Sequence, residues 1–248
     1  FFELIVYDDL RNKKARKWRK YMMRKGLTEL VFILDRSGSM SGLEADTIGG
    51  FNSLIAKQKK EEGTALISTV LFDDQTEILY DRISLDRIEP MNDRQYYVRG
   101  CTALLDALGG AIHHIGNVHK YAREEDRPEK TIFIITTDGM ENSSHRYTYD
   151  KVKKMVERQR DRYGWEFLFL GANIDAIEIA GRFGVQANRA VNYECDSEGI
   201  QLNYEVLSKA VSRVRTCAAP TAAMAFDECD DWAEEIRADY SKRHRGKR

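Results

Sequence analysis

The chain has 248 residues, and 42% of them are hydrophobic, which suits one α/β domain with appendages and a large buried core. Its 39 basic and 40 acidic side chains leave a formal net charge of −1, which excludes a general attraction to nucleic acid or anionic membrane. The four cysteines are widely spaced without a CxxC pair, so free thiols in a reducing cytoplasm are expected rather than a zinc site or disulfides.

The first part of the chain, residues 1–25, is expected to be a basic N-terminal extension. Residues 11–20 (RNKKARKWRK) form a charge run with almost no apolar stripe. Such a run is typical of a solvated arm or helix, and the alternative is a basic contact surface for nucleic acid or an acidic partner. No apolar stretch in the chain approaches the roughly 20 residues of a membrane-spanning helix.

From Leu27 onward, apolar strands alternate with segments of helical periodicity. Strands are predicted, in chain order, over residues 30–34, 65–72, 76–83, 131–137, 165–170 and 190–193. Helices are predicted around residues 48–55, 104–115, 152–159, 175–183 and 204–214.

This alternation predicts a doubly wound, mostly parallel α/β sheet with helices on both faces. The third strand follows the second so closely that the two are expected to form a hairpin, which makes one edge strand antiparallel. The predicted domain covers residues 26–216. Beyond it the pattern weakens, and residues 217–248 are expected to be a tail that is disordered or carries a loosely docked helix.

Oxygen-bearing side chains follow the buried strands. Asp35, Ser37 and Ser39 come directly after the apolar run of residues 30–34, Thr102 stands just before a helix, and Asp138 ends a later strand. Carboxylates and hydroxyls are the hard donors that hold a magnesium-like cation. In an open parallel sheet, ligands bind at the carboxyl ends of the strands. The competing interpretation is that these residues are ordinary turn and helix-cap residues.

Three segments together resemble the motifs of the von Willebrand factor type A (vWA) domain. They are residues 35–39 (DRSGS), residues 100–108 (GCTALLDAL) and residues 135–139 (ITTDG), and they occur in the family's order. The resemblance extends from about residue 27 to residue 215. It implies an intracellular, bacterial-type vWA protein with a Rossmann-like fold and a metal-ion-dependent adhesion site (MIDAS).

The resemblance also implies roles for the five residues. Ser37 and Ser39 would coordinate Mg²⁺, or alternatively Mn²⁺, through their hydroxyls. Thr102 would bind directly when a ligand is engaged and through water otherwise. Asp35 and Asp138 would mainly hold coordinated waters and orient the hydroxyls. The remaining position would take an Asp or Glu carboxylate of a partner protein, which makes the chain a cytoplasmic interaction module; a variant of this hypothesis makes it an adaptor of an AAA-type ATPase.

An enzyme is the rival class. A haloacid-dehalogenase-like hydrolase needs a second Asp where Ser37 stands, and a serine-hydrolase elbow would need its nucleophile where Met40 stands. Neither a GxxxxGK[ST] loop nor a GxGxxG motif after a strand occurs. We therefore predict no enzymatic activity; the alternatives kept open are a metal-assisted hydrolase and nucleic-acid binding through the basic extension.

Several neighbouring residues are expected to have plain structural roles. Gly139 is expected to serve backbone geometry, Cys101 to fill space, and Asn173 to make a turn. Residues 141–144 (ENSS) are expected to be polar loop surface, with a contribution to the ligand face as the alternative. The histidines have no evident partner in the sequence, and His113 and His114 are adjacent, which excludes an i, i+4 metal pair.

Overall fold

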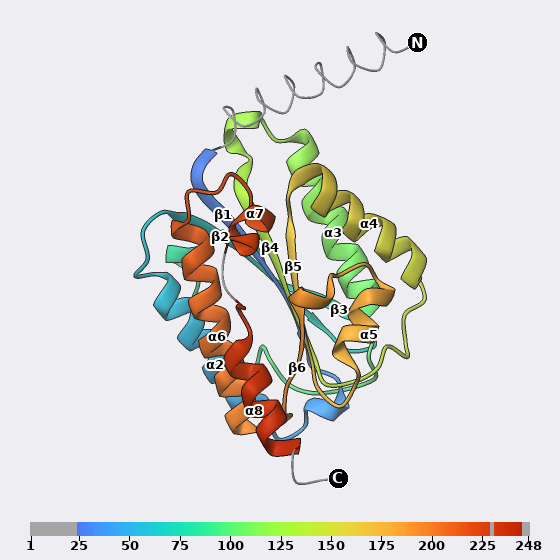
Figure 1. Ribbon diagram of the computed structural model, residues 1–248. Helices are drawn as coiled ribbons and strands as arrows, with labels where there is room; N and C mark the ends of the chain where they lie inside the picture. Colours follow the sequence, from blue (N-terminus) through green and yellow to red (C-terminus); the bar gives the residue numbers. More distant parts are fainter. Residues whose placement is uncertain (1–23, 229–230, 245–248) are drawn as a thin grey trace.

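The computed structural model describes residues 24–228 and 231–244, which form one sheet between two layers of helices (Figure 1). The strand order is β3-β2-β1-β4-β5-β6. In sequence the strands are β1 (Arg24–Asp35), β2 (Thr64–Phe72), β3 (Thr76–Ser84), β4 (Pro128–Thr137), β5 (Glu166–Gly171) and β6 (Ala190–Asn192). Only β3 pairs antiparallel among these strands. The predicted fold class is confirmed.

The helices divide between the two faces of the sheet. They are α2 (Glu44–Gln58), α3 (Leu104–Tyr121), α4 (Tyr149–Tyr163), α5 (Ala176–Arg182), α6 (Ser197–Thr216), α7 (Ala222–Asp227) and α8 (Glu234–His244). Leu30 and Phe32 of β1 pack with α2, α6, α7 and α8, whereas Val31 and Ile33 pack with α3, α4 and α5. A strand covered on both faces is apolar at every position, which explains the unbroken run of residues 30–34.

The order of the strands creates a switch point. The chain moves from β1 to β2 on one side, and later from β4 to β5 and β6 on the other. β1 and β4 are direct parallel neighbours, with Leu34 paired to Thr136. The loops after β1 and β4 therefore leave the same edge in opposite directions, at a switch point of the kind where open α/β sheets bind ligands.

The C-terminal region differs from the expected disordered or loosely docked tail. Helices α7 and α8 follow α6, which is thus not the last helix, and both pack on the same face of the sheet as α2 and α6. Phe226, Trp232 and Ala233 are buried there, and the Trp232 indole donates to the Asn188 carbonyl at 2.9 Å. Large apolar side chains that are too sparse to show a period still drive docking when the sheet offers a complementary surface.

At the other end, β1 begins at Arg24, where it pairs with Pro128, two residues before the predicted domain start. The basic run of residues 11–20 lies outside the described residues, so its interpretation stays a prediction. None of the helices in residues 24–228 and 231–244 combines the length and the apolar character that a transmembrane span needs.

Candidate metal centre

Asp35 is the last residue of β1 and contacts the end of β4 at the switch point. Its Oδ1 accepts a hydrogen bond from the Ser37 backbone N–H at 2.7 Å. Its Oδ2 accepts from the Thr137 hydroxyl, at the end of β4, at 2.5 Å. The residue is almost completely buried, at 1% exposure. Asp35 is therefore held by groups from both sides of the switch point.

A chain of hydroxyls leads from the first loop to the third. The Ser37 and Ser39 Oγ atoms lie 3.0 Å apart, and Ser39 Oγ donates to Asp138 Oδ1 at 2.5 Å. Asp138 directly follows β4 and is 2% exposed. The structure thus brings Ser37, Ser39 and Asp138 into contact, although Asp138 is far from them in sequence.

The Thr102 hydroxyl also lies near this cluster, and the position of Gly139 shows it. A Cβ atom built on Gly139 would lie 3.3 Å from Thr102 Oγ1 and 3.4 Å from Ser39 Oγ. The two hydroxyls therefore face the position of Gly139, where an added Cβ would press on both of them. Gly139 does not have a positive φ. No left-handed conformation therefore requires a glycine here, and the expected role in backbone geometry stays a prediction beside the space it leaves for the two hydroxyls.

Residues after Asp138 hold Thr102 rather than forming mere loop surface. Asn142 Oδ1 accepts from the Thr102 N–H at 2.9 Å, and the Asn142 N–H donates to the Thr102 carbonyl at 3.0 Å. Glu141 accepts from the Leu105 N–H at 2.9 Å and from the Ser144 hydroxyl at 2.8 Å. Backbone N–H groups at the start of α3 would otherwise lack partners. These contacts fix the start of α3 against the third loop.

The site carries negative charge without a fixed positive partner. In the described part of the chain, no Lys, Arg or His nitrogen lies within 4.0 Å of the carboxylates of Asp35 and Asp138. Arg36, which follows Asp35 in the first motif, is bonded to Asp73 instead. Burial raises the pKa of Asp35 from 3.8 to about 6, the hydrogen bonds from Thr137 and Ser37 oppose that rise, and the Asp138 charge adds to it.

The donor set suits a hard cation. It consists of three hydroxyls and two carboxylates, all oxygen, as Mg²⁺ and Mn²⁺ prefer. Among residues 24–228 and 231–244, no group of three or more His, Cys, Asp and Glu side chains is arranged to hold a metal ion. The candidate centre is of a different kind, because most of its donors are the hydroxyls of Ser and Thr.

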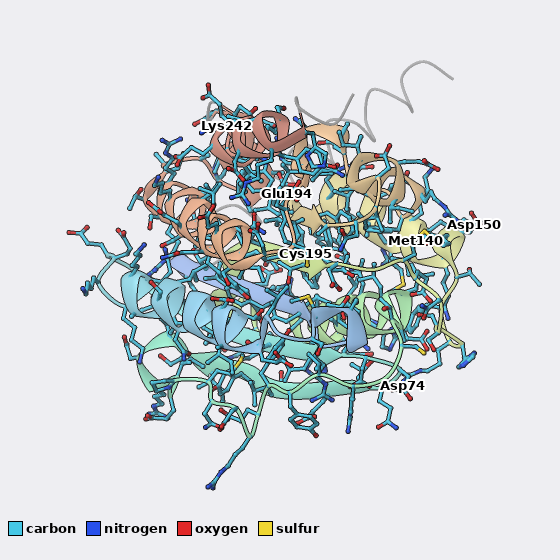
Figure 2. All side chains as sticks on the ribbon, turned by 90° about the horizontal axis from the view of Figure 1, so that it is seen from below. Asp74, Met140, Asp150, Glu194, Cys195 and Lys242 are labelled. Atoms are coloured by element: carbon cyan, nitrogen blue, oxygen red, sulfur yellow. The ribbon has the colours of Figure 1, made fainter. Side chains whose placement is uncertain are left out.

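Two residues of the site were missed by sequence reasoning. The Tyr96 hydroxyl donates to the Asp35 carbonyl at 2.5 Å, and Cys195 Sγ lies 3.5 Å from Asp138 Oδ2. Burial, followed by the Asp138 charge, raises the pKa of Cys195 to about 12, so its thiol stays protonated and can donate. Figure 2 views the molecule from this end, and its labels Cys195 and Met140 mark the loops after β6 and β4. Cys195 follows a strand end, a signal that sequence reasoning could have used; Tyr96 gives none.

The other candidates lie apart from this cluster. Cys101 is exposed, so the expectation that it fills space was wrong. His119 Nε2 lies 2.5 Å from a carboxylate oxygen of buried Glu29, and His114 Nε2 lies 2.8 Å from Asp81. These histidines have partners that the sequence did not reveal. Asn173 has a φ of 56°, as expected for a turn residue.

No protein-family model matches the sequence, and no curated protein sequence matches it significantly. Solved structures do match. Proximal thread matrix protein 1 of the mussel byssus gives a TM-score of 0.52 at 16% identity, over 75% of this chain and 46% of that one. A second structure of that protein, described as having a zinc-occupied MIDAS motif, gives the same values. The chain therefore spans less than half of the mussel protein.

A further match is the von Willebrand factor domain of the type V pilus tip protein Mfa5 from Porphyromonas gingivalis. It gives a TM-score of 0.53 at 11% identity, over 77% of this chain and 97% of that one. The chain thus has the vWA fold, and the fold implied by the three motifs is confirmed. At these identities the comparisons carry the fold alone.

Proposed function

We propose that this chain is a metal-dependent protein-interaction module. One observation carries the proposal: two buried carboxylates, Asp35 and Asp138, stand beside converging hydroxyls with no cationic side chain facing them in the described residues. A bound divalent cation would supply the missing positive charge. The zinc-occupied MIDAS motif of the mussel relative supports a divalent metal, and the all-oxygen donor set favours Mg²⁺ or Mn²⁺.

Each residue has a distinct task in this proposal. Ser37, Ser39 and Thr102 offer neutral hydroxyl oxygens to the cation. Asp35 and Asp138 would hold metal-bound water. Asp138 already accepts from the Ser39 hydroxyl, and Asp35 accepts from the Ser37 backbone N–H and the Thr137 hydroxyl. Neutral direct ligands leave the bound cation with most of its charge, so it attracts an outside carboxylate. A partner's Asp or Glu side chain is the natural ligand for the open position.

The metal itself is the first test. Titration calorimetry with MgCl₂ and with MnCl₂ should give one site on the wild-type chain. Asp138→Asn should lose at least about 10-fold in affinity, in the range typical of outer-sphere groups. Asp150→Asn, an exposed carboxylate in the first turn of α4, is the matched control and should bind as the wild type does. Absence of binding by the wild type would overturn the proposal.

The partner is the second test. Immobilised chain should capture a protein from lysate in Mg²⁺ and release it in EDTA, and excess acetate should compete because it supplies free carboxylate. Ser37→Ala should capture less, and equal capture in Mg²⁺ and EDTA would contradict the mechanism. The family resemblance favours an AAA-type ATPase as the partner and the cytoplasm as the compartment. Identifying the captured protein tests both expectations.

A further inference from the structure

A second buried charge cluster lies directly beside the candidate metal site. The Arg36 side chain is fully buried, and its Nε donates to Asp73 Oδ2 at 2.7 Å. Its Nη1 donates to Glu77, on β3, at 2.7 Å. Asp73, at the turn after β2, is also fully buried. A buried arginine–carboxylate pair is rigid because either partner alone would be costly to bury.

Arg99 joins this pair from a third segment. Its Nε donates to the same oxygen, Asp73 Oδ2, at 2.7 Å, while its backbone N–H donates to the Arg36 carbonyl at 2.9 Å. Unlike the buried pair, the Arg99 side chain is 39% exposed. Arg99 lies three residues before Thr102, on the same loop. The loop that carries Thr102 is therefore fastened to a buried anchor.

Backbone hydrogen bonds hold the chain on both sides of Thr102. The Ala103 N–H donates to the Asp73 carbonyl at 2.7 Å, and the Gly38 N–H donates to the Gly100 carbonyl at 3.2 Å. Gly38 belongs to the motif that carries Ser37 and Ser39. The loops after β1 and β2 and the loop before α3 thus meet around Asp73, whose turn is marked by Asp74 in Figure 2.

We propose that Arg99 is a positioning residue, which sets Thr102 against Ser37 and Ser39 by bonding to the buried Asp73. This inference rests on the proposed function, because Thr102 is there a metal and ligand contact. None of Arg36, Asp73 and Arg99 touches the metal in this scheme. The anchor instead determines how long Thr102 stays in the geometry that the cation needs.

Arg99→Met tests this without disturbing the fold. The Arg36–Asp73 pair stays buried and paired, and the long apolar stem of the side chain is kept. Mn²⁺ affinity measured by calorimetry should fall by about 10-fold, as for other groups that orient metal ligands. Arg99→Lys, which keeps a cation near Asp73, should recover part of that loss. Arg94→Met, an exposed arginine with no side-chain bond in the described residues, is the control and should bind normally.

Amide hydrogen exchange on the metal-free protein gives a second readout. In Arg99→Met the Ala103 amide, bonded to Asp73, should exchange faster. The Leu105 amide, bonded to Glu141, should exchange at the wild-type rate and reports that α3 is intact.

The two readouts separate the possible failures. Wild-type metal binding with an unaffected Arg99→Met would overturn the role of Arg99 alone. Faster exchange throughout α3, including Leu105, would also overturn it, since the residue would then simply stabilise the fold. A wild type that binds no Mn²⁺ would overturn the proposed function, and this inference with it.

Discussion

Two buried aspartates at the ends of neighbouring strands, Asp35 as the last residue of β1 and Asp73 just after β2, have opposite electrostatic surroundings. Asp35 is bonded to hydroxyls and a backbone N–H, and burial raises its pKa to about 6. For Asp73 burial also acts to raise the pKa, but hydrogen bonds from Arg99, the Gln75 N–H and Arg36 outweigh it, and the pKa is lowered. Burial of a carboxylate thus does not by itself make a cation site. Asp35 is a candidate ligand because, unlike Asp73, it has no arginine paired with it in the described residues.

The difference also separates stability from function. Asp73 is charge-compensated within the protein, so its carboxylate supports the fold. Asp35 is uncompensated in the described residues, so its ionised form destabilises the metal-free fold until a cation arrives. The neighbouring Arg36, one residue from Asp35, pairs with Asp73 and not with Asp35. Two adjacent residues of one loop therefore have different roles: Arg36 pairs with Asp73 in the fold, and Asp35 is left for the cation.

The largest expected effect is on stability. Asp73→Asn should lower the free energy of unfolding of the metal-free protein by about 3 kcal/mol, because it leaves Arg36 buried with only the half-exposed Glu77 as partner. Asp35→Asn should not lower it at neutral pH, since an uncompensated buried charge is removed. Urea denaturation of both variants measures the contrast, and equal losses would break it.

The pH dependence of stability should show the same contrast. A raised folded-state pKa contributes stability that is present below the unfolded pKa and is lost as pH rises through the folded pKa. For Asp35 this window runs from about pH 4 to about pH 6. A shift from 3.8 to about 6 corresponds to roughly 3 kcal/mol.

The measurement is the free energy of unfolding of the metal-free wild type minus that of Asp35→Asn. This difference should grow as pH falls from 7 to 4. Asp73, with a lowered pKa, contributes constant stability in that range and loses it only below about pH 4. Saturating Mg²⁺ should flatten the Asp35 slope, and a slope that is unchanged by Mg²⁺ would contradict the site.

A smaller effect is expected from closing the space between the hydroxyls. Gly139→Ala places a methyl group 3.3 Å from Thr102 Oγ1 and should weaken Mn²⁺ binding by about 10-fold while leaving the fold intact. Gly49→Ala, on the exposed face of α2 with nothing within 4 Å of the added carbon, is the matched control. Calorimetry measures the Mn²⁺ affinity of both variants. Wild-type affinity in Gly139→Ala would show that the cation does not bind beside Gly139.

The smallest effect concerns Cys101, next to Thr102. Exposed Cys101 should react with a bulky maleimide before Cys195, whose pKa of about 12 keeps it protonated. Peptide mass spectrometry gives the order of labelling. Labelled protein should capture its partner less well yet bind Mn²⁺ with nearly wild-type affinity. The label would lie beside the metal-binding Thr102 and not on it. Cys101→Ser, treated with the same maleimide, controls for labelling at the other cysteines.

The sequence by itself determined the alternation of strands and helices, the antiparallel edge strand and the three oxygen-bearing loops. Those features are local: an apolar run covered on both faces, a helical period, and side chains at the ends of strands. The vWA fold followed from the order of the three motifs, and the fold comparison bears it out. The point at which each loop leaves its strand follows from these local patterns alone.

Only the tertiary structure decided which groups meet. The Arg36–Asp73–Arg99 cluster joins three loops whose residues are far apart in the chain, and no local pattern pairs them. The same holds for Gly139, whose role depends on Ser39 and Thr102 facing it, and for Trp232, which is buried only because the sheet surface receives it. Periodicity reports which face of an element is buried, whereas charge compensation and open space depend on the elements packed against it.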